Sequence, residues 1–389
     1  MRLLLRPLTL LGAALLLAPG CKTSSSTNAS ASSASTAAPD PAHPWRSARV
    51  GDSVTYAFSA HHGGGEGRGG APRTLAGQVT LRVVSVQAPW VWLELAFQDE
   101  AGAPLDQPRL AHPVVLPMRM DETHPIEVPP LGESAPETPT FAGRAWNAVR
   151  YTKDDRPSDG NLVNRAYAVE PGPLYLTRGL LDAATESAGF HVPGGLTLTL
   201  HGFQQGPGAS NAAPPTLERP LGPGTWYDRR VEQEPTPLLL RVCFGAERGY
   251  LLRTEGPLDP QTEPCAHLAD AEAEPLEEVL MGMAWEALSA GGWPPPSEAS
   301  SGIQGTFSVE GHDVPTLGMR RELAGQGPQR LYTEQVAADP WGPALAGLAR
   351  EARFQVLSES TERVEKDGQH VPEGGSRLVR WGTWLGGAK

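Results

Sequence analysis

The two-residue period of the apolar side chains from Trp45 onward most constrains the fold of this chain. Such alternation gives a strand one face for a core and one face for water. The clearest runs are Val54, Tyr56 and Phe58; Val79, Leu81 and Val83; Val91, Leu93, Leu95 and Phe97; and Leu196, Leu198 and Leu200. Further strands are expected at 225–231, 238–244, 250–253, 353–357 and 377–384. The pattern predicts a mainly β protein.

Helical spacing of apolar residues occurs in two stretches of the second half, near 275–290 and 343–353. The segment Gly179–Ser187 is a candidate for a shorter helix. Four acids precede or open the first stretch, and as a charge run they are expected to form a solvated face: Glu272, Glu274, Glu277 and Glu278. The predicted class is therefore β-rich α+β, a mainly β fold with a few helices.

A Gly- and Pro-rich segment at 204–223 divides the body into two parts of ordinary domain length. We expect one antiparallel β module at 45–203 and a second at 224–389, the latter containing both longer helices. Several landmarks recur in order: Gly51 and Tyr56 with Gly222 and Tyr227, Gly143 with Gly305, Arg165 and Tyr167 with Arg330 and Tyr332, and Gly202 with Gly382. Tandem duplication and chance matching in a glycine-rich chain both explain this recurrence.

The N-terminal 20 residues have the features of a secretory signal peptide. Arg2 and Arg6 precede a short apolar run, Leu8–Ala18. This run falls short of the roughly 20 residues that cross a bilayer as a helix. Cys21 follows Gly20, and this junction resembles the lipobox of bacterial lipoproteins. The resemblance implies a lipid on Cys21, although Ala18 and Pro19 depart from the usual pattern. The alternative is an ordinary signal peptide followed by a stray cysteine.

Residues 21–44 continue as a Ser-, Thr- and Ala-rich stretch with little to bury, which predicts a disordered tether after the lipidated cysteine. Lys22 resembles the residue that follows the cysteine in lipoproteins sorted to the outer membrane. We therefore expect an outer-membrane lipid anchor, with the body in the periplasm or on the cell surface. The membrane would be a partner through Cys21, and envelope proteins are further candidate partners.

The body itself carries two short motifs, Gly51–Tyr56 and Ala142–Trp146. With Cys21, they resemble uncharacterised lipoproteins of GC-rich Gram-negative bacteria such as myxobacteria. That resemblance implies no activity.

The two remaining cysteines, Cys243 and Cys265, would meet an oxidising compartment after export. We predict a disulfide between them, which would stabilise the fold by roughly 3 kcal/mol in the chain-entropy model. A buried free thiol at Cys243 and an exposed one at Cys265 are the alternative.

Motifs for chemistry are scarce. The ten histidines show no metal-ligand spacing, so no metal site is predicted. His61 and His62 precede a Gly-rich run that is expected to be a mobile connection. No serine-nucleophile elbow occurs, and no cofactor or catalytic residue is predicted. A net charge of −12 argues against a nucleic-acid partner.

These observations favour a non-enzymatic envelope lipoprotein with a structural or interaction role. The alternative is a periplasmic carrier of a lipid or other apolar ligand in a half-open β-barrel, with the helix near 275–290 as its lid. An internal cavity would favour the carrier. An aromatic groove that includes Trp293 or Trp341 is a further candidate site, and an enzyme would need a cleft where acids or histidines converge.

Overall fold

The computed structural model describes residues 43–63, 72–126, 131–158, 160–187, 194–208, 212–232, 236–258, 265, 268–290, 293, 302–323 and 329–385. Within these ranges most residues lie in antiparallel strands, and a few short helical segments connect them. This confirms the β-rich α+β class. Cys21, the signal peptide, most of the tether and the Gly-rich run after Gly63 lie outside the described residues.

The first half of the chain forms one antiparallel sheet. Its strands are β1 (Ser53–His62), β2 (Arg73–Gln87), β3 (Trp90–Gln98), β4 (Val114–Arg119), β5 (Glu133–Glu137), β8 (Ala148–Asp154), β9 (Asn161–Ala168), β10 (Leu180–Ser187) and β11 (Gly194–Gln204). A small separate hairpin joins β6 (Thr140–Phe141) and β7 (Arg144–Ala145). The spatial order is β4-β3-β2-β1-β11-β10-β9-β8-β5. The last strand, β11, therefore lies beside the first, β1.

The second half repeats this arrangement. Its strands are β12 (Thr225–Glu232), β13 (Leu238–Glu247), β14 (Tyr250–Pro257), β15 (Glu272–Pro275), β16 (Ile303–Val309), β17 (His312–Leu323), β18 (Arg330–Ala337), β19 (Val356–Val364) and β20 (His370–Thr383). Their order is β15-β14-β13-β12-β20-β19-β18-β17-β16. Each strand thus takes the same place in its sheet as its counterpart in the first half.

Three of the recurring landmarks fall in corresponding strands. Tyr56 and Tyr227 lie in β1 and β12, and Arg165 and Arg330 lie in β9 and β18. Gly202 pairs with Thr55 in the first sheet, as Gly382 pairs with Trp226 in the second. The pair Gly143 and Gly305 does not correspond, because Gly143 lies in the small β6–β7 turn and Gly305 in β16. The strand order is the stronger evidence for a duplication, since it extends across both sheets.

The two sheets are joined where β4, an edge strand of the first, pairs with the end of β13 in the second. Arg119 of β4 pairs with Glu247 of β13, and Val115 forms a bridge with Pro220. The Gly- and Pro-rich segment at 204–223, which was expected to separate the two modules, is hydrogen-bonded to both halves. Ser85 donates to the Ala212 carbonyl, and the Arg350 amide donates to the Pro220 carbonyl. Each half supplies one sheet, and the contacts of Pro39–Lys389 group as one compact unit.

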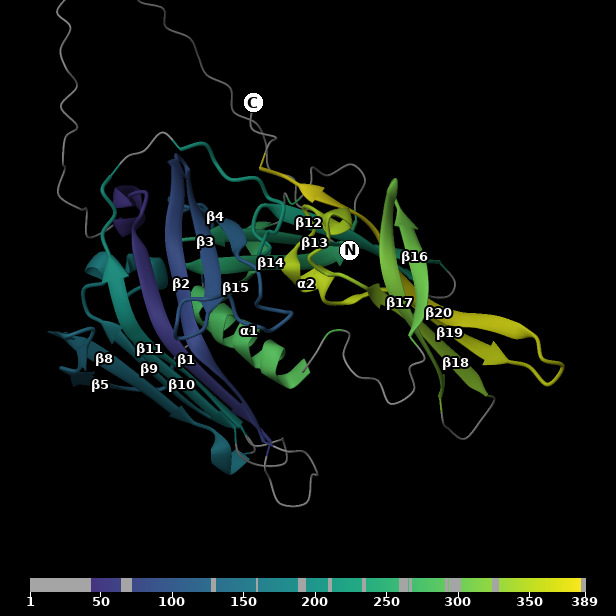
Figure 1. Ribbon diagram of the computed structural model, residues 1–389, viewed down its shortest axis with the longest axis horizontal. Helices are drawn as coiled ribbons and strands as arrows, with labels where there is room; N and C mark the ends of the chain where they lie inside the picture. Colours follow the sequence, from purple (N-terminus) through teal and green to yellow (C-terminus); the bar gives the residue numbers. More distant parts are fainter. Residues whose placement is uncertain are drawn as a thin grey trace, which may run out of the picture. The chain divides into compact units, whose positions relative to one another are not determined.

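Helix α1 (Leu276–Ala290) confirms the helix expected near 275–290, and it contacts β1, β2 and β11 of the first sheet (Figure 1). Its buried apolar side chains belong to the same core cluster as those of the first half: Leu276, Leu280, Met281, Met283, Ala284, Ala287 and Leu288. Burial of such side chains is the main force that holds a helix on a sheet. A helix encoded in the second half therefore completes the core of the first.

The remaining helical segments are short. They are η1 (Pro44–Ser47), η2 (Arg156–Ser158), η3 (Gly172–Thr177), η4 (Leu268–Asp270), η5 (Pro343–Leu345) and α2 (Arg350–Arg353). The helix expected near 343–353 is present only as two short segments, η5 and α2, because Gly347 adopts a φ of 79° and interrupts it.

The helix expected at Gly179–Ser187 is also wrong, since this segment forms β10. Arg178 and Gly179 both have positive φ and turn the chain from η3 into the strand. Leu180–Ser187 then pairs with β9 on one side and β11 on the other. Sheet hydrogen bonds on both edges outweigh the weak local preference of an Ala-containing segment.

Candidate functional site

The first turn of α1 is fixed to β9 by an ion pair. The Arg165 guanidinium donates to Glu278 through Nε (2.6 Å) and Nη2 (2.9 Å). Its other N–H groups donate to the Asn164 and Ala184 carbonyls and to the Thr185 hydroxyl. Arg165 is only 1% exposed. A buried cation with every donor satisfied fixes both the position and the orientation of the helix.

The neighbouring carboxylate, Glu277, is fully buried in a second network. The Tyr167 hydroxyl donates to Glu277 Oε1 (2.7 Å), and Arg178 Nη2 donates to the same oxygen. Arg178 also donates to the Tyr250 hydroxyl (2.5 Å). Burial, followed by the Glu277 charge, raises the pKa of Tyr167, so its hydroxyl stays protonated and remains a donor. This network joins β9, η3 and β14 to the start of α1.

The solvated face expected for the acids is therefore wrong for Glu277 and Glu278. Their partners, Arg165, Tyr167 and Arg178, lie about a hundred residues earlier in the chain. A charge run next to a helix has no local signal that separates a docking face from a solvated one.

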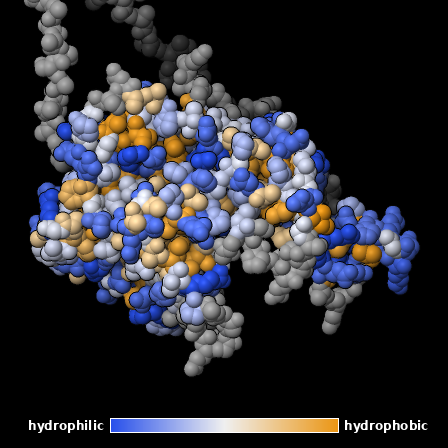
Figure 2. Space-filling view, viewed as in Figure 1, coloured by the Kyte–Doolittle hydropathy of each residue, from blue (hydrophilic) through white to orange (hydrophobic). Residues whose placement is uncertain are grey.

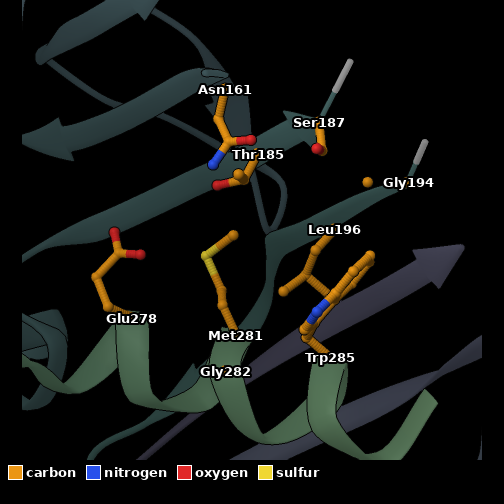
Figure 3. Close-up of a pocket in the computed structure, with 10 residues that line it drawn as sticks. Asn161, Thr185, Ser187, Gly194, Leu196, Glu278, Met281, Gly282 and Trp285 are labelled. Carbon is orange, nitrogen blue, oxygen red and sulfur yellow. The ribbon is translucent and has the colours of Figure 1, made fainter. Parts of the chain in front are cut away.

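Beside the ion pair, a groove runs between α1 and the strands β9, β10 and β11 (Figure 3). Its volume is about 450 Å³. The helix side consists of Glu278, Met281, Gly282 and Trp285, and the strand side of Asn161, Thr185, Ser187, Gly194, Gly195 and Leu196. In the surface view, hydrophobic residues gather where α1 lies (Figure 2). The groove thus has apolar walls, and polar groups cluster near Glu278.

Two glycines give the groove its shape. A Cβ on Gly194 would come within 2.6 Å of the Trp285 ring, so the indole lies directly on the bare backbone of β11. On the helix side, a Cβ on Gly282 would meet no atom within 4 Å. The Trp285 ring also contacts the His62 ring edge-on, with centroids 5.1 Å apart. The empty space therefore lies opposite Gly282, and Trp285 forms one of its walls.

Cys243 and Cys265, the predicted pair, form a disulfide with a Cα–Cα distance of 5.4 Å. Both are buried in a small cluster with Leu252 and Leu268. The disulfide joins β13 to the segment before η4 and lies outside the groove.

Two of the ten histidines lie beside the groove. His62 contacts Trp285 and His61 lies against Gly195. Among the described residues, no group of three or more His, Cys, Asp or Glu side chains could hold a metal ion. No helix in the described ranges is long and apolar enough to cross a membrane.

Comparison with known proteins identifies a family. Residues 3–389 match a family of unknown function, DUF6068. The chain belongs to this family. No curated protein matches the DUF6068 chain.

Two solved structures show a distant similarity to this DUF6068 protein. One is a protein of unknown function from the DUF3598 family of Nostoc punctiforme, 10% identical, covering 85% of this chain and 96% of its own, with a TM-score of 0.15. The other is a β-barrel-like protein of the domain of unknown function DUF1849 from Brucella abortus, 8% identical, covering 86% and 99%, with a TM-score of 0.12. At these scores neither similarity adds to the fold described above.

Proposed function

We propose that this protein is a lipid-anchored, non-enzymatic protein of the cell envelope whose body binds an amphiphilic or apolar ligand in the groove beneath α1. The observation that carries the proposal is the groove itself, about 450 Å³ between a helix and a sheet. This volume lies within the range of small-ligand sites, roughly 300–1,000 Å³.

The lining favours a ligand with an apolar body and a polar end. Met281, Trp285 and Leu196 offer apolar contact along the groove. Asn161, Thr185 and Glu278 provide hydrogen-bonding groups, and a few such groups among apolar walls are typical of sites that orient a small molecule. Glu278 is engaged by Arg165, which leaves the end of the groove polar without an unpaired charge.

The docking of α1 explains why the groove persists. The ion pair at Glu278 and the buried apolar side chains fix the helix on the sheet. Gly282 leaves the space next to it empty, because it has no side chain to fill it. The helix therefore acts as the lid of a half-open site, in the role that the carrier hypothesis assigns to it.

The test fills the groove from the helix side. Gly282→Phe places a ring in the empty space, whereas the matched control Gly282→Ala adds only a methyl group. A bromine-labelled fatty acid serves as the probe, because it quenches the fluorescence of a nearby tryptophan. We expect quenching in the wild type and in Gly282→Ala, and its loss in Gly282→Phe.

The chain contains ten tryptophans, so Trp285→Phe identifies the source of the quenched signal. Equal quenching in Gly282→Phe and the wild type would contradict a site in this groove. If the fatty acid does not bind the wild type, the ligand-binding proposal fails and a structural or interaction role is favoured instead.

The anchor has a separate test. Cys21→Ala is expected to release the protein from the membrane fraction, since a charge of −12 gives it no attraction to an anionic surface. Membrane association that persists in this variant would refute the lipid anchor and leave the groove proposal unaffected.

A further inference from the structure

A second cavity, of about 350 Å³, lies at the C-terminal end of α1, apart from the groove residues described above. Three parts of the chain form it: the segment between β3 and β4, the end of α1, and α2 with the residues that follow it. Its lining is Arg109, Glu286, Ser289, Arg350, Glu351, Phe354 and Gln355. Two arginines more than 200 residues apart in sequence thus share one small space.

Arg350 is almost completely buried, with 4% of its surface exposed. Its Nη1 donates to Glu286 Oε2 (3.2 Å) and its Nη2 to the Arg109 carbonyl at 3.5 Å. Its Nε is buried and has no hydrogen-bond partner. One weak carboxylate contact is a poor counterion arrangement for a guanidinium so far from water.

The charge of Arg109 is compensated by even fewer contacts than that of Arg350. Its guanidinium makes no hydrogen bond with any described residue, and its closest carboxylate oxygen, on Glu286, is 3.9 Å away. It lies against two aromatic rings, 4.8 Å from the Phe354 centroid and 5.3 Å from that of Trp293. Cation–π contacts position a guanidinium but leave its N–H donors unused. Among the described residues, the buried Nε of Arg109 is therefore held in place without an acceptor.

Two glutamates line the cavity together with the two arginines, but they pair with these arginines incompletely. Glu286 forms an ion pair with both arginines, and its side chain is 53% exposed. The other lining acid, Glu351, accepts a hydrogen bond from Tyr227 and lies 3.5 Å from Arg253, so it is engaged elsewhere. Burial lowers the pKa of both Arg109 and Arg350, and Glu286 opposes the shift only in part. Among the described residues, the two guanidinium groups therefore share one half-exposed carboxylate, that of Glu286, as their counterion.

We propose that Arg109 and Arg350 form a binding site for a compact oxyanion, a phosphate or a carboxylate group, held between the two guanidinium groups. Planar guanidinium forks match the oxygen geometry of both anions. Inorganic phosphate and the phosphomonoester headgroup of a lipid both present this chemistry. The site is separate from the groove and does not depend on the function proposed for it.

Calorimetric titration of the full mature chain with inorganic phosphate, at constant ionic strength, measures the site directly. We expect Arg109→Gln to weaken phosphate binding about tenfold or more, the usual effect of losing a charge-assisted hydrogen bond. The matched control is Arg46→Gln, because Arg46 is exposed and 3.7 Å from Asp121. Phosphate affinity in this control is expected to equal that of the wild type.

The direction in which phosphate affinity changes in Glu286→Gln distinguishes an anion site from a structural ion pair. Removal of the shared carboxylate frees both arginines, so phosphate binding should tighten several-fold. A purely structural ion pair predicts the opposite: the variant would lose stability and gain nothing for phosphate. Weaker or absent phosphate binding in Glu286→Gln would overturn the proposal, as would equal binding in Arg109→Gln and the wild type.

Titration with a short-chain phosphatidic acid separates the two sources of the anion. Tighter binding than inorganic phosphate, lost in Arg109→Gln, assigns the site to a lipid headgroup. Equal affinity for both probes assigns it to the free anion. If neither probe binds the wild type, the proposal fails.

Discussion

The ion pair between Arg165 and Glu278 should control the attachment of α1 to the first sheet, and a double-mutant cycle can measure this. Glu278→Gln keeps the shape of the side chain but removes the charge opposite a guanidinium that is 1% exposed. Arg165→Met removes the guanidinium and leaves Glu278 without its cationic partner. The double variant removes both charges and leaves neither one buried alone.

The structure sets the expected magnitude. Breaking one side of a buried ion pair costs about 3–5 kcal/mol. The 32% exposure of Glu278 lets water reach the ion pair, which reduces this cost to roughly 2–3 kcal/mol. An unfolding entropy of about 2.1 cal/mol/K per residue over the roughly 295 described residues gives roughly 0.6 kcal/mol/K. The Tm of each single variant should therefore fall by about 3–5 °C.

Thermal unfolding followed by circular dichroism is the assay, with urea unfolding as a second measurement. The double variant should be clearly more stable than the sum of the two single losses predicts, because the residues are in direct contact. Arg156→Met is the matched control, since Arg156 pairs with Asp154 on the exposed surface and should lose little. Strictly additive losses, or single losses no larger than that control, would refute a docking role for the pair.

Two further predictions concern stability. Burial acts to raise the pKa of Glu247, but hydrogen bonds from Thr123 and His124 outweigh it and hold that pKa below its ordinary value. A lowered folded pKa adds stability that is complete above the unfolded value of about 4.3 and is lost as the pH falls from there through the folded pKa. The Tm gap between the wild type and Glu247→Gln should therefore narrow steadily as the pH falls below about 4.3. Reduction of the Cys243–Cys265 disulfide should cost about 3 kcal/mol, measured as a Tm decrease in dithiothreitol beside intact-mass analysis of the two thiols.

Much of the fold follows from local pattern. The alternating runs around Tyr56, Leu81 and Leu93 all form strands, because a two-residue period with one apolar face suits only a half-buried strand. Helix α1 follows equally well from its apolar spacing. The prediction of a helix at 179–187 was wrong because a short Leu- and Ala-containing run suits a helix or a strand equally well. Pairing with β9 and β11 makes it a strand.

The candidate sites could not be predicted in the same way, since their parts come from distant positions. Glu278 meets Arg165 across 113 residues, and Arg109 meets Arg350 across 241. Neither separation has a spacing that a single sequence would reveal. The place of Gly282 in the groove could not be predicted either, because the sequence of a helix does not show whether the space beside a glycine is filled.

The two halves share one strand order, but they differ in the long helix α1, which only the second half contains among the described residues. Two nine-stranded sheets of identical order are the expected product of a tandem duplication followed by divergence. Yet α1 follows β15 in the second half and packs in the core of the first. On β18, Arg330 and Tyr332 instead find acids within their own sheet, Glu373 and Glu359. A chain cut at 204–223 would therefore leave one half without its helix and the other with an exposed apolar face, so the two halves depend on each other to fold.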